Sequence, residues 1–286
     1  MTPAQSDPQL LRDVAEQLAT EAAEFVVLCR QEVFGDSAGS GSSDGDAAVR
    51  TKSTPTDPVT IVDTETERLL RTRIGELRPG ERILGEEEGG PGGSGDGELT
   101  WVLDPIDGTV NFLYGIPAFA VSVGVQRHGV SVAGAVADVA GAALYSAARG
   151  CGAHVRRGGV SQALSCSGSD DLSTALIGTG FSYERSRRQG QGEVVARLLP
   201  QVRDLRRIGS CALDLCMVAA GRLDGYYEDG VQLWDWAAGA LIAAEAGAHV
   251  RLPTRRSGVG MVVAAGPGIS AAFDDLLLRC GATEAP

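Results

Sequence analysis

The chain has 286 residues, of which 43% are hydrophobic and 22% are charged, the balance of an ordinary globular protein. Lys and Arg number 25 against 37 Asp and Glu, so the net charge is −12 at pH 7. This excess of negative charge disfavours broad binding to nucleic acid or anionic membranes, because like charges repel. It does not exclude an anionic substrate, since a bound cation inverts the local field.

The cysteines and the start of the chain bear on the cellular compartment. Six cysteines and three histidines occur without a Cys-x-x-Cys pair or the usual zinc spacings, which favours isolated thiols in a reducing compartment. The first residues, MTPAQSDPQLLRD, lack the basic start and apolar core of a signal peptide. No apolar run reaches the ~18–20 residues of a membrane span. We therefore expect a cytoplasmic protein without nucleic-acid or membrane partners.

Helical periodicity dominates the start of the chain. Apolar residues recur at helical spacing over 8–34, and Asp7-Pro8 is a suitable helix start. Residues 35–48, GDSAGSGSSDGDAA, break all periodicity and predict a loop. A β-prone run at 59–62 precedes a second helix that is predicted to open at Asp63-Thr64 and to run to about 77. A short strand is then predicted at 83–85.

From residue 118 onward the pattern is first that of strands and then alternates between strands and helices. An antiparallel meander is predicted at 118–126, 130–139, 142–148 and 152–155, with an edge piece at 164–167. Later strands are predicted at 175–178, 205–208, 225–227, 250–252 and 259–265, and helices at 190–199, 210–220, 235–246 and 269–280. This alternation favours an α/β architecture, and the sequence contains no internal repeat.

Residues 101–112, WVLDPIDGTVNF, combine an apolar run with two acids and a turn. The run 101–103 is typical of the end of a buried strand, and Asp104 and Asp107 follow it. Gly108 permits a tight turn, and Thr109 is a suitable start for a short helix. Carboxylate oxygens bind hard cations, and free N–H groups at a helix start bind anions. The stretch predicts a place for cations and a phosphate, although an ordinary Asp/Gly turn would contain the same residues.

Acidic residues recur just after apolar strands or at helix starts. They are Asp63, Glu86-Glu87, Asp104 with Asp107, and Asp235. Strand ends in open α/β sheets are where ligand sites gather. Asp235 stands between Trp234 and Trp236, which indicates either a site residue or a helix N-cap between core aromatics.

Four segments in this order resemble the signatures of the inositol monophosphatase family: KSTPTDPVTIVD at 52–63, GEEE at 85–88, WVLDPIDGTVNF at 101–112 and GVQLWDWAAG at 230–239. The resemblance covers nearly the whole chain, and RRIGSCALDLCMVAAGRLDGYYE is similar to the bacterial, actinobacterial-type branch. It implies an α/β fold of the αβαβα sandwich type, as one domain over residues 1–286 with halves at about 1–168 and 169–286. It also implies a homodimer and Mg²⁺-dependent, Li⁺-sensitive hydrolysis of small phosphate monoesters.

The resemblance assigns metal ligands by motif. Glu86, Asp104 and the carbonyl of Ile106 would hold a first Mg²⁺. Asp104, Asp107 and Asp235 would hold a second, and Glu86 would help to hold a weaker third ion. Two metal ions can clamp the attacking and leaving oxygens of an in-line displacement and acidify water, so no catalytic His or Cys is needed.

Catalytic and substrate residues follow from the same resemblance. Asp63 and the Thr109 hydroxyl would orient the attacking water, with Glu86 taking part through the metal ions, and the backbone N–H groups of Gly108 and Thr109 would bind the phosphate. Glu228 matches an acid that contacts inositol hydroxyls, and a carboxylate can accept hydrogen bonds from vicinal hydroxyls.

Three further positions follow from the resemblance with alternatives left open. Ser210 and Cys211 fall where small residues line the substrate pocket, and a cysteine is unusual at the second of these. Lys52 matches a lysine on a loop near the metals, or it is simply a solvated loop residue. The loop at 35–48 is longer and richer in glycine than the family pattern, which leaves the third metal ion open.

The substrate also has alternatives. Myo-inositol 1-phosphate is the leading candidate, motivated by Glu228 and the bacterial-branch resemblance. On the same fold, histidinol phosphate, fructose 1,6-bisphosphate and phosphoadenosine phosphate are the other candidates. A role of a different class is a protein-binding cofactor of transcription or ribosome assembly, as some bacterial relatives have.

Overall fold

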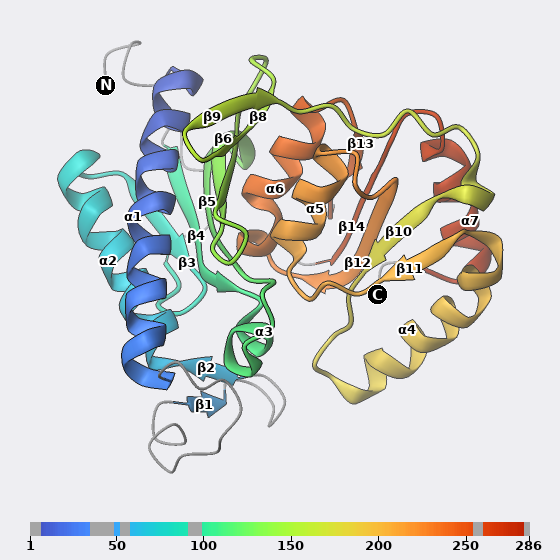
Figure 1. Cartoon of the computed structure of the whole chain (residues 1–286), viewed down its shortest axis with the longest axis horizontal. Coiled ribbons are helices and arrows are strands. Elements are labelled where there is room, and N and C mark those ends of the chain that lie inside the picture. The colour runs from blue at the N-terminus through green and yellow to red at the C-terminus, as the bar shows by residue number, and fades with distance from the viewer. Residues whose placement is uncertain (1–6, 35–48, 52–57, 91–98, 254–259, 283–286) are drawn as a thin grey trace.

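The computed structural model describes residues 7–34, 49–51, 58–90, 99–253 and 260–282. Lys52 and the loop at 35–48 lie outside the described residues. Two mixed β-sheets and a small ribbon, β1 (Val49–Thr51) with β2 (Pro58–Thr60), form the β structure. Helices cover and separate the two large sheets (Figure 1).

The first large sheet is a seven-stranded meander in which sequence order equals spatial order. Its strands are β3 (Arg82–Gly85), β4 (Leu99–Asp107), β5 (Ala120–Arg127), β6 (Val130–Asp138), β7 (Ala143–Ala148), β8 (Ala153–Arg157) and β9 (Val160–Ala163). Strands β3 and β4 are parallel, and all later neighbours are antiparallel.

The edge of this sheet differs from the prediction. The predicted edge piece at 164–167 is wrong, because the strand that pairs with β8 is β9. Gly158 and Gly159 both adopt positive φ, at 53° and 80°, so they form a two-residue hairpin turn that reverses the chain at once. Pairing therefore begins at Val160, four residues earlier than the apolar pattern indicated.

The second large sheet has five strands in the order β11-β10-β12-β14-β13. They are β10 (Leu176–Thr179), β11 (Asp204–Arg206), β12 (Gly225–Val231), β13 (His249–Arg251) and β14 (Gly260–Ala265). Strand β10 is parallel to both of its neighbours, whereas β14 is antiparallel to β12 and β13.

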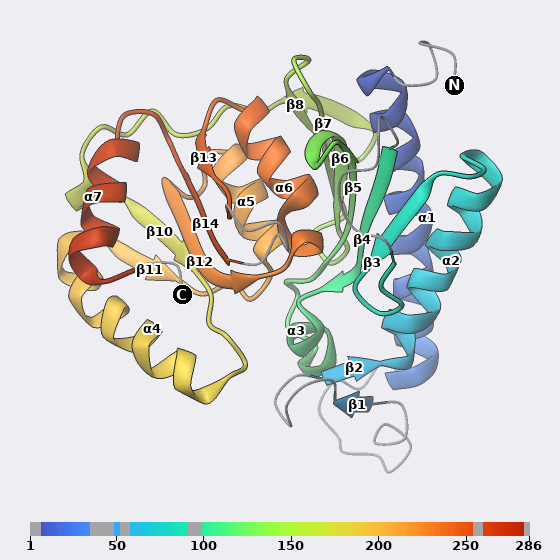
Figure 2. The same ribbon diagram turned by 180° about the vertical axis from the view of Figure 1, so that it is seen from behind.

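The helices complete the layers. They are α1 (Pro8–Phe34), α2 (Ile61–Leu77), α3 (Thr109–Tyr114), α4 (Arg185–Leu198), α5 (Cys211–Ala219), α6 (Leu233–Glu245) and α7 (Ser270–Cys280), with short 3₁₀ turns at Leu172–Thr174 and Leu199–Gln201. Helices α1 and α2 cover the outer face of the first sheet, α5 and α6 lie between the sheets, and α4 and α7 cover the far face of the second (Figures 1 and 2). The predicted αβαβα order of layers is confirmed.

Three apolar clusters fill the spaces between these layers. Along β4, Trp101 and Leu103 join the cluster under α1 and α2, whereas Val102 joins the cluster around α5 and α6. Successive side chains of a strand point to opposite faces, so a strand between two helical layers is buried throughout. All nine residues of β4 are buried, which anchors the strand that carries Asp104 and Asp107.

Close packing brings α6 against the first sheet. A Cβ atom at Gly134 of β6 would lie 2.9 Å from the Cα of Ala238, and one at Gly124 of β5 would lie 3.0 Å from the Cβ of Ala237. Real Cβ atoms essentially never approach to 2.9 Å and seldom to 3.0 Å, so the two glycines and the Ala-rich face of α6 allow this separation between helix and sheet. The first turn of α6, with Asp235, thereby lies next to the end of β4.

Three helices start earlier than predicted, among them α6, which begins at Leu233 rather than at 235. Helix α2 begins at Ile61 because Thr60 forms a capping box with Asp63, so the predicted strand at 59–62 ends at Thr60. Helix α4 begins at Arg185 rather than at 190 and contains Gly190, a poor helix former. Gln191 compensates through long-range contacts, since its side chain accepts from the Ser182 N–H and donates to the Asp229 carbonyl.

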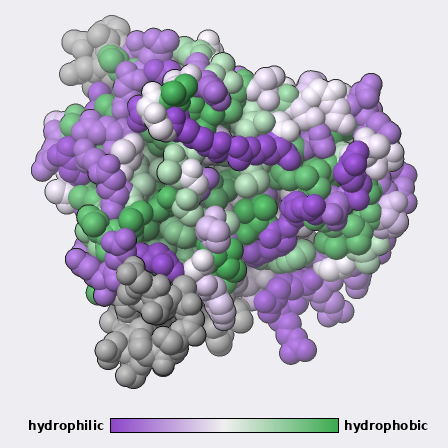
Figure 3. Space-filling view, viewed as in Figure 1, coloured by the Kyte–Doolittle hydropathy of each residue, from purple (hydrophilic) through white to green (hydrophobic). Residues whose placement is uncertain are grey.

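Among the helices of the described residues, none combines the length and apolar character that a membrane crossing requires. The six cysteines are all unpaired. The face seen in Figure 3 intersperses hydrophilic and hydrophobic residues.

Candidate active site

The end of β4 presents two carboxylates to one cavity. In a regular strand, residues three apart point to opposite faces. Here the pairing with β5 shifts register between Asp104 and Asp107, and Asp104 Oδ1 accepts the Ile106 N–H at 3.0 Å. This irregularity allows both acids to line the same cavity, as a β-bulge does. The sequence predicted that both acids follow the strand. In the structure they lie within its irregular end.

The turn after β4 requires a glycine. Gly108 has a φ of 98°, and a Cβ there would lie 3.0 Å from the carbonyl oxygens of Ala118 and Gly209. The residue is the N-cap of α3, so Thr109 is the first helical residue, as predicted. The Thr109 hydroxyl lies 3.1 Å from both the Ile106 carbonyl and Asp63 Oδ1, and it can donate to one of them at a time.

Asp63 is fixed from the opposite side by α2. Its Oδ2 accepts the Thr60 N–H at 2.9 Å and also the Thr60 hydroxyl. The Asp63 N–H in turn donates to the Thr60 hydroxyl oxygen at 3.3 Å, which completes the capping box. The carboxylate is buried, and its other oxygen meets the Thr109 hydroxyl. The structure thus brings together Asp63 and Thr109, which are 46 residues apart in the chain.

Glu86 stands in the turn that follows β3, and a buried acid holds that turn. The Glu67 carboxylate of α2 accepts the N–H groups of Glu87 at 2.7 Å and Glu88 at 3.0 Å. Arg71 pairs with the same carboxylate at 2.8 Å. Glu67 was not predicted as a site residue, although its position one helical turn after Asp63 is a usable signal.

Helices α5 and α6 supply the remaining parts of the acidic cluster. Asp235 forms a capping box with Gln232, whose N–H it accepts at 2.6 Å. Asp107 Oδ2 accepts both the Ser210 hydroxyl and the Ala212 N–H at 2.6 Å. The Ser210 side chain, predicted to line the substrate pocket, is thus engaged in supporting Asp107 and capping α5.

These elements enclose a cavity of about 110 Å³. Its acidic lining residues are Glu86, Asp104, Asp107, Glu228 and Asp235, and its other lining residues are Ile106, Gly108, Thr109, Phe181, Tyr183, Arg207, Gly209, Cys211 and Val231. Every predicted site residue within the described part of the chain lines this cavity except Asp63 and Ser210, which contact Thr109 and Asp107.

The acids perturb one another. Burial raises the pKa of Asp104 well above its usual range, and the charges of Glu86, Asp107 and Asp235 raise it further. Burial raises the pKa of Asp107 to about 7, although hydrogen bonds from Ser210 and Ala212 oppose the shift. The pKa of Asp235 is also raised well above its ordinary value, first by burial and then by Asp107 and Glu86.

This donor set suits a hard divalent cation. All of the clustered ligands are oxygens, as Mg²⁺ or Ca²⁺ requires, and a cation would relieve the repulsion that raises these pKa values. Within the described residues, no three His, Cys, Asp or Glu side chains are already placed to hold one ion. A bound cation would offset the mutual repulsion of the ionised carboxylates and allow them to turn toward a common centre.

The lining of this cavity also includes residues that were not predicted from the sequence. Phe181 and Tyr183 follow β10, and Arg207 precedes Ser210. Arg207 is exposed and is the only cationic side chain in the described lining. Its place in the RRIGS segment, three residues before the predicted Ser210–Cys211 pair, is the signal that could have identified it.

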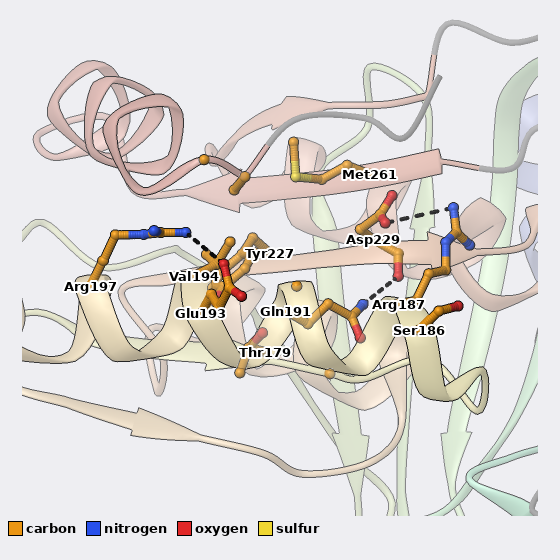
Figure 4. A pocket seen from close by; sticks show the side chains of 14 residues that line it. Thr179, Ser186, Arg187, Gln191, Glu193, Val194, Arg197, Tyr227, Asp229 and Met261 are labelled. Atoms are coloured by element: carbon orange, nitrogen blue, oxygen red, sulfur yellow. Dashed lines mark hydrogen bonds and ion pairs between the residues drawn. The ribbon is translucent and has the colours of Figure 1, made fainter.

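A second, larger cavity of about 310 Å³ lies between α4, β12 and β14 (Figure 4). Its charged residues are paired, Arg187 with Asp229 at 3.6 Å and Arg197 with Glu193 at 3.8 Å. Between these pairs lie Tyr227, Val194 and Met261. This lining lacks the concentration of carboxylates that distinguishes the smaller cavity, so we assign the chemistry to the smaller one.

Comparison with known proteins identifies the family of the chain. The model of the family described as "Inositol monophosphatase family" matches residues 7–279. Inositol-1-monophosphatase of Mycobacterium leprae is 63% identical over 285 residues, covering 98% of this chain and 97% of the relative. The Nus factor SuhB of Pasteurella multocida is 40% identical over 195 residues, covering 68% of this chain and 71% of that protein.

A solved structure extends the match to the fold. Mycobacterium tuberculosis SuhB superposes with a TM-score of 0.81 at 55% sequence identity, covering 96% of this chain and 98% of that one. The family match spans both large sheets and all of the acidic residues of the smaller cavity. The chain therefore belongs to the inositol monophosphatase family of metal-dependent phosphoric monoester hydrolases.

Proposed function

We propose that this protein hydrolyses phosphate monoesters of small polyols with Mg²⁺, and that myo-inositol 1-phosphate is its preferred substrate. The observation that carries the proposal is the cavity with five carboxylates beside Gly108 and Thr109. The name of the Mycobacterium leprae relative supports the choice of substrate.

The proposed metal ligands follow the sequence motifs. Glu86, Asp104 and the Ile106 carbonyl would hold one Mg²⁺, and Asp104, Asp107 and Asp235 would hold another. When bound, such ions neutralise phosphate charge and acidify water. Asp107 keeps one oxygen, Oδ2, on Ser210 and Ala212, so its Oδ1 is the atom we assign to the ion.

We assign the orientation of the attacking water to Asp63 and Thr109. When Asp63 Oδ1 accepts the Thr109 proton, the hydroxyl oxygen keeps its lone pairs for a hydrogen bond from water. Asp63 is itself held by Thr60, so the acceptor does not move with the substrate. Positioning of this kind accounts for a large part of the rate increase in phosphoryl transfer.

The substrate would lie in the smaller cavity, next to its acids. The backbone N–H groups of Gly108 and Thr109 would bind the phosphate, and Glu228 would accept hydrogen bonds from vicinal hydroxyls of the polyol. Cys211 lines the same cavity, and burial raises the pKa of its thiol well above the usual value, so it contributes a neutral surface.

A substrate panel tests the proposal. The purified protein is assayed with inositol 1-phosphate, glycerol phosphate, histidinol phosphate, fructose 1,6-bisphosphate and phosphoadenosine phosphate, each with Mg²⁺, with EDTA and with added Li⁺. We expect the highest kcat/KM for inositol 1-phosphate, with loss of activity in EDTA and inhibition by Li⁺. A higher kcat/KM for another member of the panel would refute the substrate assignment, and full activity in EDTA would refute the metal dependence.

A second candidate function is supported by the name of one relative. The Pasteurella multocida protein is named a Nus factor, which favours a protein-binding role in transcription.

We propose the homodimer as the form in which either role is performed. Size-exclusion chromatography with light scattering tests the dimer, and a pull-down with Asp104→Asn separates partner binding from hydrolysis.

A further inference from the structure

We propose that Tyr226 is a positioning residue that sets the selectivity for hydroxyl-bearing substrates by holding the Glu228 carboxylate. The inference rests on the proposed function, because Glu228 is the acid that we assign to the polyol. Both residues belong to β12, two positions apart, and therefore lie side by side on one face of that strand.

The first observation is the hydrogen bond between the Tyr226 hydroxyl and the Glu228 carboxylate. The Tyr226 hydroxyl donates to Glu228 Oε2 at 2.7 Å, and the Tyr226 side chain is fully buried in the cluster around α5 and α6. A buried aromatic ring has few alternative rotamers, so its hydroxyl is a fixed anchor. The neighbouring Cys211 side chain also contacts this hydroxyl.

The second observation is the close contact between Glu228 and the backbone of Gly180. A Cβ atom at Gly180 would lie 1.9 Å from Glu228 Oε2 and 2.0 Å from its Cδ. The carboxylate therefore occupies the space that any other residue at 180 would fill. The contacts with Gly180 and Tyr226 together restrict the Glu228 side chain to a narrow range of orientations.

These two contacts leave a defined acceptor for the substrate. Oε2 accepts the Tyr226 proton, and Glu228 lines the smaller cavity, so Oε1 is the atom that we assign to the substrate hydroxyl. Burial raises the pKa of Glu228, whereas the hydrogen bond from Tyr226 and the charge of Arg207 oppose this shift. A carboxylate held in place before binding loses little freedom when it accepts a hydroxyl, which is how preorganisation increases affinity.

The adjacent tyrosine provides a matched control. Tyr227 follows Tyr226 in β12 but joins the cluster of α4 and α7 on the opposite face, where it lines the larger cavity (Figure 4). Its side chain is 6% exposed against 0% for Tyr226, and its hydroxyl lies near Thr179, another residue of the larger cavity. Removal of either hydroxyl is thus the same chemical change in a comparably buried place.

The experiment compares Tyr226→Phe, Tyr227→Phe, Glu228→Gln and the double variant Tyr226→Phe/Glu228→Gln. We measure kcat/KM for inositol 1-phosphate and for p-nitrophenyl phosphate, which has no hydroxyls, and take their ratio as the selectivity. Loss of a hydrogen bond to a charged group predicts that Tyr226→Phe lowers this ratio by about 10-fold, mainly through KM. The double variant should be no worse than Glu228→Gln, because Tyr226 acts through that residue.

Gly180→Ala provides an independent variant, since its methyl group displaces the carboxylate while Tyr226 stays intact. It should lower the same ratio by a similar factor. A selectivity in Tyr226→Phe equal to that of Tyr227→Phe would overturn the inference, as would additive losses in the double variant.

Crystal structures of the wild-type protein and Tyr226→Phe separate this inference from the proposed function. A displaced Glu228 side chain in Tyr226→Phe supports the positioning role, and an unmoved one overturns it, whatever the substrate is. If the wild-type protein shows no preference for inositol 1-phosphate, the proposed substrate is wrong, while the placement of Glu228 is still decided by these structures.

Discussion

Glu67 offers a sharp test of how the fold holds the proposed metal site. Glu67→Ala removes the carboxylate that accepts two backbone N–H groups of the Glu86 turn and pairs with Arg71. Removing one partner of a buried ion pair costs about 3–5 kcal/mol, and the separate hydrogen bonds do not add in full because they share one carboxylate. We therefore expect the free energy of unfolding to fall by about 3–5 kcal/mol.

The same variant should weaken cation binding. Residues that orient metal ligands through hydrogen bonds change metal affinity by about 10- to 100-fold when removed. Urea denaturation in EDTA measures the unfolding free energy, and calorimetric Mg²⁺ titration of the folded protein measures the affinity. Glu65→Ala is the control, because this acid lies on the same helix but pairs with Arg68 in solvent.

Two results would refute the reasoning. A stability for Glu67→Ala within about 1 kcal/mol of the wild-type value would mean that the buried pair contributes no more than an ordinary surface contact. An unchanged Mg²⁺ affinity with reduced stability would mean that the Glu86 turn is not held by Glu67. Equal effects of Glu65→Ala would show that the helix as a whole, and not the buried carboxylate, determines both quantities.

Three further predictions concern the acids and their packing. Asp104→Asn should abolish phosphatase activity in a phosphate-release assay, and in EDTA it should raise the urea midpoint, because it removes one of the repelling charges. Because the pKa of Asp107 is raised from 3.8 to about 7, its contribution to stability is complete below pH ~4 and lost as pH rises through about 7. The urea midpoint of metal-free protein should therefore fall over this range, and Mg²⁺ should oppose the fall. Gly134→Val should press against Ala238, destabilise the protein by about 1–3 kcal/mol in urea denaturation and weaken Mg²⁺ binding by moving Asp235.

Each of these predictions has its own control. Asp274→Asn on α7, an exposed partner of Arg251, should leave activity intact, and near-normal turnover of Asp104→Asn at saturating Mg²⁺ would reject the ligand assignment. Asp107→Asn should flatten the pH profile in EDTA, and an unchanged profile would show that other groups cause it. Gly75→Val fills open space on α2, so a loss as large as that of Gly134→Val would exclude the packing explanation.

Local patterns were sufficient for much of the fold. The first helix has the predicted bounds, Pro8–Phe34, because its apolar spacing and its Pro start are both local signals. The break predicted at 127–129 is also present, as the turn His128–Gly129 between β5 and β6, in which Gly129 has a φ of 76°. The predicted bounds are wrong where contacts outside the element decide them. Helix α4 is an example, because its glycine-containing first half depends on the hydrogen bonds of Gln191 with Ser182 and Asp229.

The sequence by itself determined the family, the layered fold and the identity of the acids, because caps, turns and motif spacing are properties of short segments. Only the tertiary structure decided which atoms meet. The register shift in β4 turns Asp104 and Asp107 to one cavity, Ser210 supports Asp107, and Tyr226 holds Glu228. These relations depend on contacts between elements far apart in the chain or on the exact course of a strand. Periodicity shows which face of an element is buried, but it does not contain the distance to a neighbouring element, and the chemistry of the site depends on that distance.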